Sequence, residues 1–278
     1  MNTETNSGRS GHERPALLLV HGAWHGAWCW DPVRVALQAA GRHVHVVDLP
    51  SARPSYGGSW DGADRPVGMA DDAEAIREAL RAVDGPVVVV AHSYGGVPAT
   101  EAVADAPNVV RVVYLAAFQL DVGESMATFL GGHVPDDGTG QARPPADAMT
   151  SFYDDVPEEE AARAIARLRP QSVRSFTEPV TAAGWRTVPS TYVVCENDRT
   201  FDPARQAELA RRAGSVHRLP SGHSPFLSMP DGLAALLDGI GVGDAADTIG
   251  TTDAIRTTDT VDAIRTTGTT GATDTIGT

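Results

Sequence analysis

The sequence predicts an α/β protein in which helices flank both faces of a mostly parallel sheet. Short apolar runs alternate with helical patterns through most of the 278 residues, and this alternation is typical of strand–helix–strand units. One run contains four consecutive valines at 87–90, as expected for a strand that is covered on both faces. The chain is long enough to bury a sizeable core.

Most of the expected strands are apolar runs, although 215–219 is a weaker one, and a helical pattern follows most of them. The strands are expected at residues 16–20, 43–47, 86–91, 109–115, 191–195 and 215–219. The helices are expected at 32–40, 69–83, 97–104, 203–213 and 230–240. Asp31 and Asp202 each precede a proline, which predicts an N-cap followed by proline at the first helical position. Ligands of parallel sheets bind beyond the carboxyl ends of the strands, so residues just after a strand are the site candidates.

Three zones differ in composition. Residues 15–241 form the expected folded domain, and residues 119–189 are too long a connection for a loop. Helical patterns at 157–168 and 171–176 predict that this connection is a helical cap over the strand ends. The polar leader, residues 1–14, and the Thr/Asp/Gly-rich tail, residues 242–278, are expected to be disordered because they lack apolar area to offset ordering.

Composition excludes several classes of function. Thirty-six acidic and 22 basic residues give a net charge of −14, which argues against nucleic acid as a partner. Every basic residue is arginine, so Schiff-base, pyridoxal-phosphate and P-loop chemistry, which need lysine, are excluded. There is no run of 18 apolar residues and no secretory signal, so we expect a cytoplasmic protein that does not enter a membrane. Cys29 and Cys195 are expected to be free thiols.

The strongest chemical signal is the segment Ala-His-Ser-Tyr-Gly-Gly at residues 91–96, between an expected strand and an expected helix. It matches G-x-S-x-G with Ala91 in the first position. Small residues two positions either side of the serine let a strained strand-to-helix turn project its hydroxyl clear of the sheet. We therefore expect Ser93 to be a nucleophile, with the Tyr94 amide at the helix N-terminus as an oxyanion donor.

A nucleophilic serine needs a base and an orienting carboxylate. His223 follows the last expected strand in a Gly/Pro-bounded loop, and Asp198 follows the strand at 191–195. Glu196 and Asp202 are rivals for the acidic role, although Asp202 is better explained as an N-cap. The chain order Ser–Asp–His is the order found on hydrolases with a strand–serine–helix elbow.

The loop after the first strand, residues 21–30, is expected to supply the second oxyanion donor. Gly22 lets the backbone approach an acyl oxygen, and the N–H of Ala23 follows it. His21 and His25 could be read as a metal pair, but no third ligand lies nearby in the sequence, so no metal and no cofactor are expected. Trp28 and Trp30 are interpreted as packing residues.

These motifs resemble the α/β-hydrolases, in the branch of plant methylesterases and hydroxynitrile lyases that also has bacterial esterase members. The matching segments are residues 20–28, 91–96, 115–118, 193–198 and 222–223. The resemblance implies the α/β-hydrolase fold, a catalytic triad of Ser93, His223 and Asp198, and an oxyanion hole from Ala23 and Tyr94. It also implies a compact apolar pocket, and the candidate substrate-binding residues are Gly22, Trp24, His25 and Phe118.

Two departures from the family matter. The hydroxynitrile lyases carry a threonine at the position of Gly22 and a lysine directly after the histidine, where this chain has Ser224. The resemblance therefore disfavours cyanohydrin cleavage and favours a serine esterase acting on a small or medium apolar ester. A lactonase, lyase or cyclase-type step with the same triad, and a non-catalytic ligand receptor, are the alternatives. The natural substrate and the oligomeric state cannot be read from the sequence.

Overall fold

The computed structural model describes residues 14–52, 66–132 and 140–240. Its central feature is a six-stranded sheet with the order β2-β1-β3-β4-β7-β8, in which every neighbouring pair is parallel. The strands are β1 Ala16–Val20, β2 Val44–Val47, β3 Val87–His92, β4 Val109–Leu115, β7 Ser190–Cys195 and β8 Ser215–Leu219. All six coincide with the expected runs to within a residue at either end, and the predicted fold class is confirmed.

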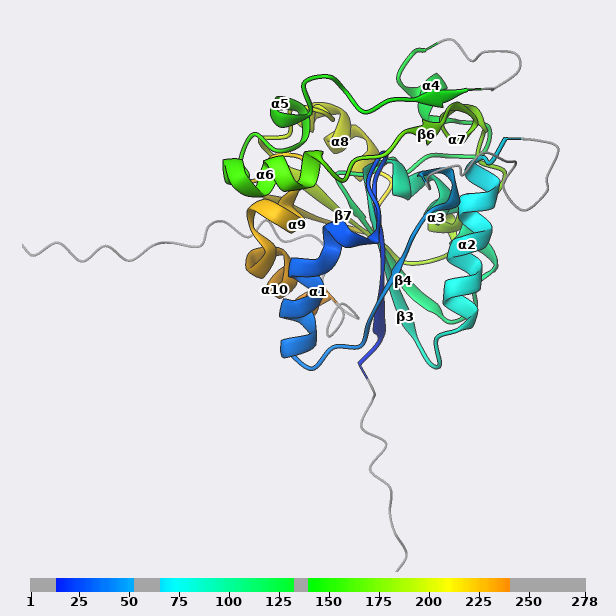
Figure 1. Ribbon diagram of the computed structural model, residues 1–278. Coiled ribbons are helices and arrows are strands. Elements are labelled where there is room, and N and C mark those ends of the chain that lie inside the picture. Colours follow the sequence, from blue (N-terminus) through cyan, green and yellow to red (C-terminus); the bar gives the residue numbers. More distant parts are fainter. Residues whose placement is uncertain (1–13, 53–65, 133–139, 241–278) are drawn as a thin grey trace, which may run out of the picture. The chain divides into compact units, whose positions relative to one another are not determined.

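Helices cover both faces of this sheet, as Figure 1 shows with α1 and α10 on one side and α2 and α3 on the other. Their bounds are α1 Asp31–Ala39, α2 Met69–Arg81, α3 Gly96–Ala102, α8 Pro203–Ala210, α9 Pro225–Ser228 and α10 Pro230–Ile240. Alternate side chains of each strand point to opposite faces. Leu18 and Val89 therefore join the core beneath α2 and α3, and Leu17 and Val88 join the core beneath α1 and α10.

The two predicted N-caps have different outcomes. Asp202 caps α8, because its Oδ1 accepts a hydrogen bond from the Ala204 N–H at 2.8 Å. The prediction for Asp31 is wrong. Helix α1 already begins at Asp31, Trp30 occupies the cap position, and the Asp31 carboxylate pairs with Arg34 one turn later. The 3-10 turn at Ala27–Trp30 runs directly into α1, so the helical path starts before the aspartate.

The segment between β4 and β7, residues 119–189, is here called the inserted segment. Its described part contains α4 Met126–Phe129, α5 Ala148–Phe152, α6 Glu158–Ile165, α7 Val173–Thr177 and the antiparallel pair β5 Gln141–Ala142 with β6 Gln171–Ser172. In Figure 1 these elements lie above the carboxyl ends of the strands. The helical pattern expected at 171–176 is partly wrong, because Gln171 and Ser172 pair with β5 before α7 begins. The expected leader and tail lie outside the described residues, apart from position 14.

Candidate active site

Ser93 occupies a sharp turn between β3 and α3. Its φ of 51° lies in the left-handed region, which costs energy for a residue with a side chain and is characteristic of a strained nucleophile. The Ser93 carbonyl accepts a hydrogen bond from the Phe118 N–H at 3.1 Å, which ties the turn to the end of β4. A β-carbon at Gly95 would lie 2.5 Å from the His21 carbonyl oxygen, so an alanine here would force the backbone to shift. Ala91, by contrast, fits fully buried in β3.

Three side chains from separate strand ends form a continuous hydrogen-bonded line. Ser93 Oγ lies 3.2 Å from His223 Nε2, and His223 Nδ1 lies 2.7 Å from Asp198 Oδ2. Their exposed fractions are 8%, 2% and 5%. Because Nδ1 donates to the carboxylate, Nε2 is left to accept the serine proton. The structure thus brings together the three residues that the sequence singled out.

The Asp198 carboxylate is surrounded by donors. Its Oδ1 accepts from the backbone N–H groups of Thr200 and Phe201, each at 2.8 Å. Its Oδ2 accepts from Gln206 Nε2 at 2.8 Å in addition to His223. These bonds satisfy a buried anion and fix the direction in which it faces the imidazole. The rival Glu196 lies on the surface, paired with Arg218 at 3.5 Å.

The loop after β1 packs directly against the serine. A β-carbon at Gly22 would lie 2.9 Å from the β-carbon of Ser93 and 2.7 Å from His92 Nδ1, so only glycine fits. The next residue, Ala23, is buried, and the structure gives its N–H no hydrogen-bond acceptor among the described residues. An N–H group without an acceptor, next to a glycine that packs on Ser93, has the arrangement that an oxyanion hole requires.

His25 and His21 brace this loop through their rings. His25 Nδ1 donates to the Ala23 carbonyl at 2.7 Å, and its Nε2 accepts from the Tyr153 hydroxyl at 2.7 Å. Burial lowers the pKa of His25 to about 3, so the ring is neutral. His21 Nε2 accepts from the Leu49 N–H at 3.0 Å while Nδ1 donates to the Gly22 carbonyl. In both rings, hydrogen bonds within the protein occupy both nitrogens, which are the atoms that would have to bind a metal ion.

His92, inside the serine motif, received no role from the sequence. Its Nε2 donates to the carbonyl of His223 at 2.9 Å, and the two rings lie 4.6 Å apart between centroids. Burial lowers the pKa of His92 well below its ordinary value, so the ring stays neutral. It therefore holds the backbone of the base without adding a charge beside it.

Aromatic side chains surround the rest of the site. Trp24 contacts Phe152 and Phe176 at centroid separations of 5.8 and 5.5 Å, and Phe152 also contacts His223 at 5.7 Å. Phe118 is buried and stacks on Phe201 at 4.5 Å. Trp24 is half-buried next to the site, whereas the Phe118 ring faces a second aromatic cluster.

Sequence reasoning missed the residues that support the site from a distance. Asp72 of α2 is fully buried and accepts hydrogen bonds from Ser51 and from the Tyr94 hydroxyl at 2.6 Å. A signal for it existed, because Asp72 shares the apolar face of its helix with Met69 and Ile76. Gln171 and Tyr153 of the inserted segment carried no such signal.

Comparison with known proteins agrees with this geometry. The description "Alpha/beta hydrolase family" matches residues 17–236. A probable hydrolase, R7, of a Phoma species is 34% identical over 250 residues, covering 81% of this chain and 97% of the relative. Pheophorbidase of Raphanus sativus is 30% identical, covering 80% and 92%.

A solved structure extends the similarity to three dimensions. The methylesterase MES16 from Arabidopsis is 28% identical with a TM-score of 0.66, and the match covers 81% of this chain and 98% of that one. No helix in the described part of the chain has the length and apolarity needed to cross a membrane. The chain belongs to the α/β-hydrolase family, in the methylesterase-like branch, and the names of these relatives support the expectation of a carboxylic ester hydrolase.

Proposed function

We propose that the protein is a serine esterase that cleaves a small or medium apolar carboxylic ester through an acyl-enzyme on Ser93. The observation that carries this proposal is the hydrogen-bonded line from Ser93 through His223 to Asp198 at the carboxyl ends of three strands. Side chains that only pack the interior would not need a strained serine, an imidazole and a multiply bonded carboxylate in one line.

The first half of the reaction forms the acyl-enzyme. His223 Nε2 takes the proton from Ser93 Oγ as that oxygen attacks the ester carbonyl carbon. The carbonyl oxygen becomes an oxyanion, which the N–H groups of Ala23 and Tyr94 stabilise. The protonated His223, held by Asp198, then donates its proton to the leaving alkoxide, and the alcohol departs.

The second half returns the enzyme to its starting state. His223 takes a proton from a water molecule, whose oxygen attacks the acyl carbon, and the same two N–H groups stabilise the second oxyanion. The bond to Ser93 Oγ breaks, the serine oxygen recovers its proton from His223, and the carboxylic acid leaves. No cofactor or metal is needed in either half.

The surroundings of the site support an apolar substrate. Trp24 contacts Phe152, which contacts His223, and Phe176, which contacts the Tyr94 ring. The buried His25 is neutral. The methylesterases among the relatives act on methyl esters by name. We therefore include a compact ester group, with a lactone as the alternative cyclic form, in the proposal. A cytoplasmic setting also belongs to it, since Cys29 and Cys195 are free thiols as in a reducing compartment.

The test is hydrolysis of p-nitrophenyl acetate and butyrate by the wild type and by Ser93→Ala and His223→Ala variants. Either substitution should lower kcat at least roughly 10³-fold, because the nucleophile and the base act as one unit. Ser215→Ala, at the amino end of β8, is the matched control and should retain full turnover. Mass spectrometry of the quenched wild type should find the acyl group on Ser93. Turnover without such an adduct would favour a lyase or cyclase step, and unchanged turnover in Ser93→Ala would remove the esterase mechanism.

A further inference from the structure

Trp24, the residue after the Ala23 oxyanion donor, has a strained backbone. Its φ is 61°, in the left-handed region that side-chain-bearing residues rarely adopt. Such a conformation persists only where surrounding contacts hold it. Because the Ala23 N–H is part of the chain immediately before this bend, the direction of that donor depends on what keeps residue 24 in place.

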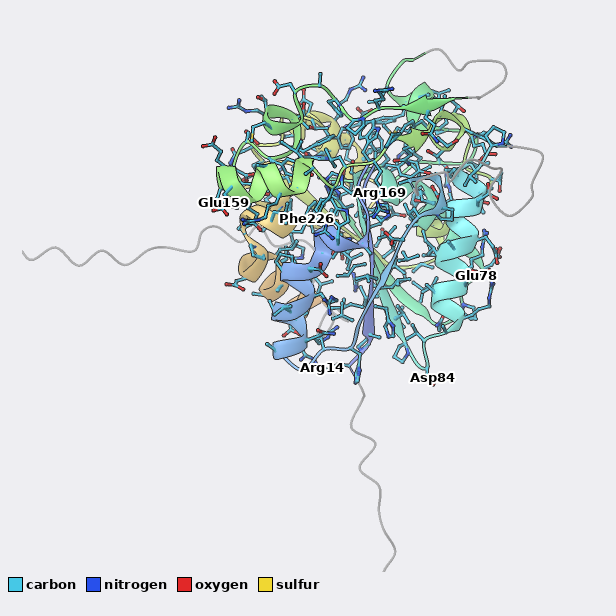
Figure 2. All side chains as sticks on the ribbon, in the orientation of Figure 1. Arg14, Glu78, Asp84, Glu159, Arg169 and Phe226 are labelled. Carbon is cyan, nitrogen blue, oxygen red and sulfur yellow. The ribbon has the colours of Figure 1, made fainter. Side chains whose placement is uncertain are left out.

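The inserted segment holds Trp24 at three atoms. The Trp24 N–H donates to Gln171 Oε1 at 2.8 Å, and the Trp24 carbonyl accepts from the Arg169 N–H at 2.9 Å. The indole Nε1 donates to the Ala142 carbonyl at 3.1 Å. Arg169, itself a residue of the inserted segment, is labelled near the middle of Figure 2. Of the three, only the bond to Gln171 comes from a side chain of the inserted segment.

The contacts of Gln171 fix its amide in one orientation. Its oxygen faces the Trp24 N–H, so the amide nitrogen must point the other way, where it donates to Ser51 Oγ at 3.1 Å and Ser175 Oγ at 3.0 Å. Both serine hydroxyls already have acceptors, since Ser51 donates to Asp72 and Ser175 donates to the Ser172 carbonyl. Gln171 is fully buried and has a partner for each of its polar atoms.

The same network reaches the second oxyanion donor. Asp72 Oδ2 accepts from Ser51 Oγ at 2.5 Å and from the Tyr94 hydroxyl at 2.6 Å. Tyr94 carries the amide that follows the nucleophile, and its ring is fully buried. A continuous set of hydrogen bonds thus runs from the Trp24 peptide through Gln171, Ser51 and Asp72 to the Tyr94 side chain.

We propose that Gln171 is a positioning residue for the oxyanion hole, which it keeps aligned by accepting the Trp24 N–H and by joining the Trp24 loop to the Asp72–Tyr94 pair. The inference rests on the proposed esterase function. On this proposal, stabilisation of the transition state, as well as binding of the substrate, requires the inserted segment to be packed correctly against the Trp24 loop. Gln171 itself touches no reacting atom.

The decisive variant is Gln171→Met, which keeps the length of the side chain and removes its polar atoms. Because Ser51 and Ser175 keep their own acceptors, the Trp24 N–H is the group left without a partner. The concentration of active enzyme is first found by titrating the reactive serine. We expect kcat normalised to that concentration to fall roughly ten- to a hundredfold with KM little changed, since a misdirected oxyanion donor affects the transition state alone. The fall should be by the same factor for acetate, butyrate and hexanoate esters.

Hydrogen exchange gives a readout that does not depend on activity. The Trp24 amide should exchange at least tenfold faster in Gln171→Met than in the wild type. Gln141→Met, on the exposed strand β5 of the same segment, makes the same chemical change and should alter neither quantity. Ser175→Ala removes one acceptor of the Gln171 amide and should shift both quantities in the same direction by a few-fold, which keeps the test available if Gln171→Met does not fold.

These experiments distinguish a failure of the Gln171 positioning role from a failure of the proposed esterase function. Gln171→Met with wild-type kcat per active serine and wild-type Trp24 exchange would overturn the positioning role. A fall in kcat that varies with acyl length would also overturn it, because that pattern indicates a changed pocket. Failure of the esterase proposal would instead appear as unchanged turnover in Ser93→Ala, whatever Gln171 does.

Discussion

The sheet and the inserted segment contribute to the site in different ways. Each residue of the Ser93–His223–Asp198 line follows a strand of the sheet, and backbone N–H groups support the carboxylate at its end. The inserted segment has short helices and a two-residue strand pair. It reaches the site through a small number of hydrogen bonds, such as those of Gln171 and Arg169 to Trp24 and that of Asp155 to the Gly222 N–H at 2.6 Å.

The sheet positions the side chains of the Ser93–His223–Asp198 line, whereas the inserted segment adjusts the structure around them. A parallel sheet can bring distant residues to one edge because its strands are held in register along their whole length. A loosely structured insertion cannot impose register, so it acts at a few anchoring atoms. Changes at the sheet edge should therefore abolish turnover or folding, and changes in the inserted segment should have smaller effects.

The largest effect is expected from Asp198→Asn. The amide can no longer hold His223 in the tautomer that accepts the serine proton, so kcat should fall on the order of 10³–10⁴-fold. Glu196→Gln, two residues earlier and on the surface, is the matched control and should retain activity. Steady-state kinetics with p-nitrophenyl butyrate measures both. Equal activity of the two variants would mean that the carboxylate at the end of β7 does not orient the base.

Gly95→Ala tests the packing of the serine turn. The new β-carbon would meet the His21 carbonyl oxygen at 2.5 Å and the Val20 carbonyl oxygen at 3.2 Å, so backbone atoms at the end of β1 would have to shift. We expect a loss of about 1–3 kcal/mol in the free energy of unfolding, with lower turnover because the turn must move. Gly239→Ala in α10 meets no atom within 4 Å and should be neutral or stabilising. Urea unfolding of both variants would show whether the turn tolerates the extra atom.

Most of the sheet could be predicted from the sequence because its inner strands are largely apolar. The valines of β3 have no solvent-facing side, so their pattern is unambiguous. The inserted segment offered less, since strand pairing over Gln171–Ser172 depends on the distant residues Gln141–Ala142 and leaves no local periodicity. A two-residue strand cannot be recognised in the sequence without knowing which strand it pairs with.

The site residues could be predicted where they lie in short sequence motifs that contain glycine. Gly95 and Gly96 follow Ser93 closely in the sequence, and Gly222 precedes His223. Gly95 is explained by the close approach of the His21 carbonyl oxygen. Supporting residues such as Gln171 act through contacts across more than a hundred positions of the chain. Nothing in the amino acids next to them reports such a partner.

The third prediction concerns Asp72, which is hydrogen-bonded to both Ser51 and Tyr94. Burial raises the pKa of its carboxyl to about 7, although hydrogen bonds from Ser51 and Tyr94 oppose the shift. Between roughly pH 4, where an unfolded aspartate titrates, and pH 7, the folded protein keeps this proton and the unfolded chain releases it. Asp72 alone therefore makes the folded state less stable as pH rises through that window, by about 1.4 kcal/mol per pH unit.

Asp72→Asn removes this dependence. The free energy of unfolding of the wild type minus that of the variant should decrease from pH 5 to pH 7 and become constant above about pH 8. Urea unfolding at four pH values measures it, and Glu78→Gln, on the exposed face of α2, should show no such trend. A difference that stays constant from pH 5 to pH 8 would mean that Asp72 is ionised throughout, held by its three hydrogen bonds.

The smallest effect is expected where the inserted segment meets His25. Tyr153→Phe removes the hydroxyl that donates to His25 Nε2 at 2.7 Å and leaves a buried acceptor without a partner, which should cost about 1 kcal/mol of unfolding free energy. Tyr114→Phe is the matched control in the sheet, where the hydroxyl bonds Thr100 Oγ1 at 2.8 Å. If anchoring of the inserted segment acts on the oxyanion loop, Tyr153→Phe should also lower kcat a few-fold, whereas Tyr114→Phe should change stability alone. Equal kcat in the two variants would show that His25 holds the Ala23 carbonyl without help from the inserted segment.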